Sequence, residues 1–111
     1  MMEKSKKYLS DILMSISLIE EFVVGIDHFN DYENDRKTQS AVERQLGIIG
    51  EALTKLRKFE PAILIENDRQ IIGFRNRIIH AYDSVDNSIV WAIIKRHLKN
   101  LKNDVLLLIT D

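Results

Sequence analysis

One short stretch of the sequence carries side chains that can act together on a phosphate group. It runs Arg75-Asn76-Arg77-Ile78-Ile79-His80-Ala81-Tyr82. Arginine stays charged and presents a planar fork matched to phosphate oxygens, and histidine, with an ordinary pKa of about 6.5, exchanges protons near neutral pH. Arg75 and His80 are therefore candidate catalytic residues, Asn76 is a candidate orienting group, and Tyr82 is a phenol that can be modified.

The same side chains match what RNA cleavage without a metal ion requires. That reaction needs a base for the 2′-hydroxyl, an acid for the leaving 5′-oxygen and a cation on the phosphate. His80 would move the proton and Arg75 would bind the phosphate. The plain alternative is a helix-end histidine and a surface arginine, because this spacing also arises by chance.

A helix that carries these residues would not by itself bring Arg75 and His80 together. On an ideal helix the two point about 140° apart, whereas Asn76 and His80 share a face. The helix could end before His80, or two copies of it could meet across a two-fold axis and form the site jointly. Arg77 points about 200° from Arg75 and is not expected in the site.

The composition predicts a single domain over residues 1–111 that favours helix. Of the 111 residues, 45% are hydrophobic and 30% charged, with one proline and four glycines. There is no cysteine, which excludes disulfides and thiolate nucleophiles and suits a reducing cytoplasm. The formal net charge of −1 provides no overall field for nucleic acid, so any attraction for RNA has to be local.

Nothing in the sequence predicts a membrane span or a signal peptide. The longest unbroken apolar run, 89–94, is far too short to cross a bilayer. The early lysines are not followed by a long apolar segment. We expect a cytoplasmic protein that uses no cofactor and no metal ion.

Apolar residues at steps of three and four predict four helical segments. The first runs from about Lys4 to Val24, and the second from about Ser40 to Phe59. The third begins at Asn67 or Asp68, and the fourth begins after Asp86. The polar segment Asp27–Gln39 is expected to be an exposed connection in which Thr38 or Ser40 caps the second helix. The predicted fold is an all-α, antiparallel four- to five-helix up-down bundle.

Two details of these helices carry further expectations. Gly47 and Gly50 lie inside the second helix, where each costs up to about 1 kcal/mol, so close backbone packing is expected at both. The apolar stripe of the last helix is expected to contain Val90, Ile94, Leu101, Val105 and Leu108, with His97 near it as a packed or helix-surface histidine.

The residues of the short stretch resemble a known signature. Arg75, His80 and Tyr82 fit the Arg-X4-His-X-Tyr pattern of the HepT-like branch of the HEPN superfamily. The resemblance extends along nearly the whole chain in the expected order, through Tyr8–Leu13, Arg44–Ala52, Gly73–Asn76 and Val85–Trp91. In the last helix this chain has His97-Leu98-Lys99 where the family often has Asp-Leu-Pro.

The resemblance implies a fold, an activity and two partners. It implies an all-α homodimer in which Arg75 and His80 face a shared cleft, acting as a metal-independent endoribonuclease and as the toxin of a type VII-like toxin–antitoxin pair. The implied antitoxin is an MntA-type minimal nucleotidyltransferase that attaches AMP to Tyr82. A bulky anionic group two residues from His80 would repel an RNA phosphate.

Two other functions stay open on the sequence. The chain could be a non-catalytic module that presents substrate or nucleotide to a nucleotidyltransferase, or a plain helical interaction protein. Among the remaining polar residues, His28 near three aspartates matches no metal-ligand spacing and favours a solvated loop. Glu43, Arg44 and Glu51 lie on the second helix, where an ion pair with another helix is expected and a supporting role near the cleft is the alternative. The basic residues of the last helix favour a solvated face or an extension of an RNA groove; they are Lys95, Arg96, Lys99 and Lys102.

Overall fold

Long apolar stripes with few breakers form helices throughout the computed structural model. It describes residues 1–63, 65, 68–80 and 85–110, with the side chains of 78–80 excepted, and has no strand in those ranges. The elements are α1 (Glu3–Phe22), α2 (Phe29–Glu33), α3 (Arg36–Phe59), α4 (Arg69–His80), α5 (Asn87–Ala92), the π-helical turn η1 (Ile93–His97) and α6 (Leu98–Thr110). The predicted all-α bundle is confirmed.

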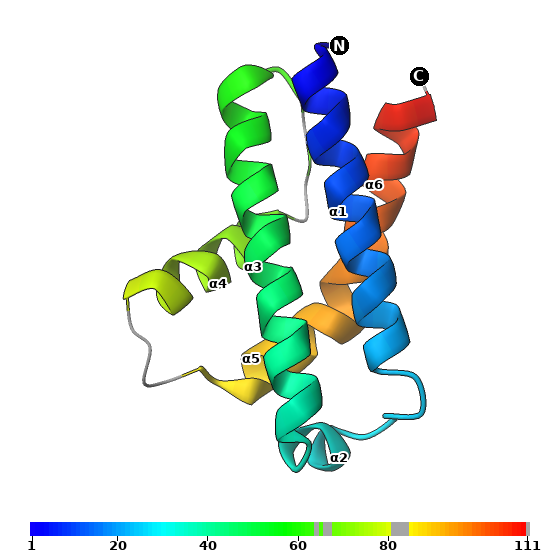
Figure 1. Cartoon of the computed structure of the whole chain (residues 1–111), viewed down its shortest axis with the longest axis vertical. Helices are drawn as coiled ribbons and strands as arrows, with labels where there is room; N and C mark the ends of the chain where they lie inside the picture. The colour runs from blue at the N-terminus through cyan, green and yellow to red at the C-terminus, as the bar shows by residue number, and fades with distance from the viewer. Residues whose placement is uncertain (64, 66–67, 81–84, 111) are drawn as a thin grey trace.

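The long helices run alongside one another, and α4 lies across them (Figure 1). α1 packs mainly against α3 and runs antiparallel to it, and α6 packs on α1. α4 contacts α3 and is therefore held by the longest helix of the molecule. None of the helices in the described ranges is both long and apolar enough to cross a membrane.

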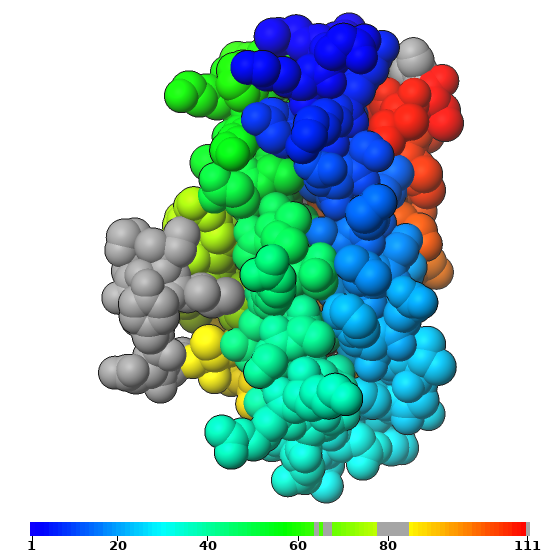
Figure 2. Space-filling view, viewed as in Figure 1, coloured from blue at the N-terminus to red at the C-terminus, as the bar shows by residue number. Residues whose placement is uncertain are grey.

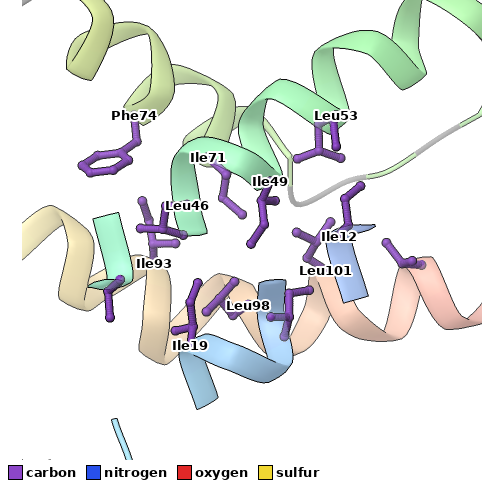
Figure 3. Close-up of a cluster of buried hydrophobic side chains, with 14 of the residues drawn as sticks. Ile12, Ile19, Leu46, Ile49, Leu53, Ile71, Phe74, Ile93, Leu98 and Leu101 are labelled. Carbon is purple, nitrogen blue, oxygen red and sulfur yellow. The ribbon is translucent and has the colours of Figure 1, made fainter. Parts of the chain in front are cut away.

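The core lies where α1, α3, α4 and the last helical segment meet (Figure 3). Each fully buried leucine or isoleucine there stabilises the fold by about 1.5–3 kcal/mol relative to an exposed position. Ile71 and Phe74 of α4 point into the cluster and fix which face of α4 is turned away from it. The labelled partners are Ile12, Ile19, Leu46, Ile49, Leu53, Ile93, Leu98 and Leu101.

The segment expected to be an exposed connection is partly structured. It contains α2, and Tyr32 of that helix is fully buried beside Trp91, with ring centroids 5.5 Å apart. α3 begins at Arg36, earlier than the predicted Ser40, because Asp35 is the N-cap. Its carboxylate accepts hydrogen bonds from the Thr38 backbone nitrogen (3.1 Å) and hydroxyl (2.7 Å). The predicted caps Thr38 and Ser40 are therefore wrong.

The predicted fourth helix is a continuous run of helical turns with a π-helical turn at its middle. Asp86 caps it as expected, with its side chain accepting from the Ser88 backbone nitrogen. The core positions include Ile93 and Leu98, whereas Ile94 and Leu108 of the predicted stripe are half-buried, as is His97. A step of five residues is too long for one α-helical turn, and the wider π turn accommodates it.

Candidate functional site

Arg75 is held against α3 by the buried residues that precede it on α4 and by the glycine that it contacts on α3. Its neighbour Phe74 and the preceding turn's Ile71 are buried in the core, so α4 cannot rotate without exposing them. Gly50 of α3 lies directly beside the stem of Arg75. A side chain at that position would push the two helices apart. The expectation of close packing is confirmed for Gly50, whereas nothing described lies within 4 Å of a Cβ built at Gly47.

The guanidinium of Arg75 is bound at both terminal nitrogens. One donates to the Glu51 carboxylate of α3, and the other donates to the Asn76 side-chain oxygen at 3.2 Å. The Arg75 side chain is 24% exposed, which leaves part of the fork open to solvent. A cation fixed in direction and partly exposed is suited to binding an anion such as a phosphate.

His80 is the last residue of α4, so the helix does not end before it. The first of the two arrangements expected from the sequence is therefore wrong, because α4 stays regular through the whole stretch from Arg75 to His80. The position of the imidazole and the placement of Tyr82 lie outside the described residues. On a regular helix Arg75 and His80 of one chain point in different directions.

A groove of about 510 Å³ is lined by residues of α1 and α3, the two helices at the front of the view in Figure 2. Its walls carry three basic and three acidic side chains, which are Lys7, Arg44, Lys55, Asp11, Glu43 and Glu51. Burial raises the pKa of Glu43 above its ordinary value. Glu51 lines this groove and also forms the ion pair with Arg75, which itself does not line the groove.

The other polar residues singled out in the sequence lie apart from this arrangement or have structural partners. His28 is exposed, and no group of metal-binding side chains is found within the described part of the chain. Arg77 is exposed and helps to lower the pKa of Asp86, after the stronger effect of the hydrogen bonds from Ser88. Lys102 pairs with Glu20 of α1 at 3.1 Å. Lys95 lies over the Trp91 ring at 4.7 Å.

The sequence reasoning gave Glu51 only a minor place. The structure confirms its ion pair with another helix and identifies the partner as Arg75. A signal was present: a carboxylate directly follows Gly50, an interior glycine that marks close approach of a second helix. No sequence pattern connected that approach to the stretch around Arg75.

Comparison with known proteins identifies the family. A family model described as "Ribonuclease HepT-like" matches residues 12–107. The chain belongs to the HepT-like ribonuclease family. The resemblance noted in the sequence is thereby confirmed, and so is the expectation of an RNA-cleaving enzyme at the level of the family. The matched region contains Glu51, Arg75, Asn76, His80 and Tyr82.

Individual relatives agree with this assignment. A Thermococcus cleftensis protein described as a probable ribonuclease HepT is 40% identical over 106 residues, covering 92% of this chain and 93% of the relative. A Methanocaldococcus jannaschii protein described as a candidate RNase is 34% identical over 101 residues, covering 90% and 92%. A third, from Caldanaerobacter subterraneus, is 33% identical and is described in the same way, with 94% and 93% covered. No solved structure matches the chain.

Proposed function

We propose that this protein is a metal-independent endoribonuclease that acts as the toxin of a toxin–antitoxin pair. The observation that carries the proposal is the Arg75 guanidinium, held between Glu51 and Asn76 on the helix that ends with His80. Membership of the HepT-like ribonuclease family supports the same activity.

The proposed reaction uses the chain's own residues. Arg75 binds the scissile phosphate and offsets the negative charge that grows on its oxygens. A proton leaves the 2′-hydroxyl, the 2′-oxygen attacks phosphorus, and the bond to the 5′-oxygen breaks as that oxygen gains a proton. His80 takes part in this proton transfer, since an imidazole both accepts and donates protons near neutral pH.

The site is proposed to form in a homodimer. Arg75 and His80 point about 140° apart on one regular helix, and α4 is helical through both. Two copies of α4 related by a two-fold axis would let Arg75 of each subunit approach His80 of the other. We therefore propose that two copies of the helix meet across a two-fold axis, which is the second of the two arrangements expected from the sequence.

Regulation is proposed to act through Tyr82. An MntA-type nucleotidyltransferase would attach AMP to its hydroxyl, and the added negative charge close to His80 would repel RNA. RNA and this enzyme are thus the proposed partners.

The purified protein tests the nuclease proposal directly. Cleavage of single-stranded RNA is expected to continue in EDTA and to fall roughly 10²- to 10⁴-fold in His80→Ala, the usual range for loss of an acid–base group. His28→Ala is the matched control, because His28 is an exposed histidine at the N-cap of α2 and does not belong to α4. The role of the Arg75 cation is tested in the same way, by comparing the cleavage rate of Arg75→Ala with that of Arg77→Ala. Loss of cleavage in EDTA, or full activity in His80→Ala, would refute the proposed mechanism.

A further inference from the structure

Three charged side chains form a row across α3 and α4. Lys55 and Glu51 are one turn apart on α3, with Nζ 3.5 Å from Oε1. The other carboxylate oxygen, Oε2, accepts from Arg75 on α4. Glu51 therefore connects two cations through its two oxygens. Lys55 also lies 5.9 Å from the ring centroid of Tyr8, which links the row to α1.

This row restricts the direction of the Arg75 fork. A guanidinium has five N–H donors in one plane, and a partner at each terminal nitrogen leaves it little freedom to turn. Glu51 is the partner on α3, and Asn76 is the partner on α4 itself. Among the residues that the structure describes, Glu51 is thus the partner that ties the fork to a second helix. The stem has little room to move because it lies against Gly50.

The exposure of the row argues that its main role is not stability. The Glu51 and Lys55 side chains are 44% and 48% exposed. Ion pairs this open to water typically stabilise a fold by about 0–1 kcal/mol. Two cations and one carboxylate leave the row with a net positive charge. Lys55 therefore offsets the Glu51 charge, which would otherwise cancel the attraction of Arg75 for a phosphate.

We propose that Glu51 is a positioning residue of the ribonuclease site, which holds the Arg75 fork toward the scissile phosphate while Lys55 keeps the site positively charged. This inference rests on the proposed function for its substrate, but not for the contact between Glu51 and Arg75. Glu51 does not transfer protons in this account. It acts through Arg75.

Kinetics on single-stranded RNA test the role. Glu51→Ala is expected to lower kcat roughly 10- to 100-fold, the scale of misplacing a reacting group by about 1 Å. Glu51→Gln, which keeps an oxygen acceptor, is expected to recover part of that loss. The pH dependence of kcat is expected to keep its shape in both. Lys55→Met is expected to raise KM with a smaller change in kcat. The matched control is Glu20→Ala, which also breaks an ion pair between two helices, with Lys102.

A second measurement needs no RNA. The Nε–H resonance of Arg75 is assigned by its absence from the spectrum of Arg75→Lys. In the wild type its chemical shift is expected to differ from that of free arginine. In Glu51→Ala the shift is expected to move toward the free-arginine value. If the wild type fails to cleave RNA, the proposed function is wrong and this resonance still decides whether Glu51 holds Arg75. If the wild type cleaves RNA and Glu51→Ala matches it in kcat with an unchanged resonance, the positioning role is overturned. Loss of one limb of the pH profile in Glu51→Gln would make Glu51 a proton-transfer residue and overturn it too.

Discussion

Gly50 and Arg75 meet so closely that the space between them admits no further atom. A Cβ built on Gly50 would lie 2.6 Å from the Cβ of Arg75 and 3.2 Å from its Cγ. The obstacle is the base of a side chain and not its flexible end, so relief requires α4 to move. The glycine thus determines how near the guanidinium comes to Glu51.

Gly50→Ala is expected to destabilise the protein although alanine favours helix. The gain in helix propensity is about 1 kcal/mol, and overpacking costs about 1–3 kcal/mol, so the net loss is expected to be about 1 kcal/mol. RNA cleavage should fall as well, because Arg75 is displaced. Urea unfolding and initial cleavage rates measure the two effects.

Gly47→Ala is the matched control on the same helix. A Cβ there meets nothing described within 4 Å, so the variant is expected to gain about 0.5–1 kcal/mol from helix propensity. If Gly47→Ala lost as much stability as Gly50→Ala, the contact between the two helices would not explain the effect at Gly50.

Local patterns in the sequence predicted most of the fold. The apolar stripes of α1, α3 and α4 fixed their type and buried faces, and Asp86 marked the start of the last helix, because each signal lies within a few residues. α2 was missed because its burial depends on Tyr32 meeting Trp91, which is distant in sequence. The π turn was missed because Ile94 and His97 also suit a regular stripe, and only packing selects Ile93 and Leu98.

The candidate site was predictable in its residue types and not in its contacts. The short stretch predicted Arg75 and Asn76 as site residues, because residues that are adjacent in the sequence can be recognised as a group. The Glu51 contact joins residues on different helices and depends on how α4 crosses α3. The way in which α4 crosses α3 cannot be predicted directly from a single sequence.

The two aspartate caps predict how stability responds to acid. The Thr38 hydroxyl, followed by its backbone N–H, lowers the pKa of Asp35, and Ser88 does the same for Asp86. A carboxylate whose pKa is lowered by folding stabilises the fold above its unfolded pKa, about 3.9, and loses that effect as pH falls through the folded pKa.

The double variant Asp35→Asn/Asp86→Asn tests this. Asparagine caps helices about as well as aspartate but does not titrate, so Tm near pH 7 should change little and the fall of Tm below about pH 4 should be smaller than in the wild type. Asp27→Asn removes an exposed carboxylate outside the helices and is the matched control. Parallel acid curves for wild type and double variant would contradict the prediction.

The proposed dimeric site predicts complementation between two inactive variants. Arg75→Ala keeps His80, and His80→Ala keeps Arg75. If each site takes its arginine from one subunit and its histidine from the other, a mixed dimer contains one intact site. Refolding the two variants together in equal amounts should restore about a quarter of the wild-type activity, since half of the dimers are mixed and each has one of two sites. Each variant refolded alone is the control. Absence of any recovery, with mixed dimers demonstrated by mass, would place the site within single subunits.

The proposed regulation predicts a specific modification. The chain contains three tyrosines, and Tyr32 is fully buried, so its hydroxyl is shielded from an incoming nucleotide. Co-expression with an MntA-type nucleotidyltransferase is expected to add an adenylyl group to the peptide that contains Tyr82, and to abolish RNA cleavage by the purified protein. Tyr82→Phe keeps the ring but lacks the accepting hydroxyl, so it should stay unmodified and active under the same conditions. Tandem mass spectrometry locates the added mass, with the Tyr8 and Tyr32 peptides as internal references. Silencing that persists in Tyr82→Phe without any adenylyl mass would mean that the antitoxin acts by binding alone, because no covalent charge would then stand beside His80 to repel the RNA.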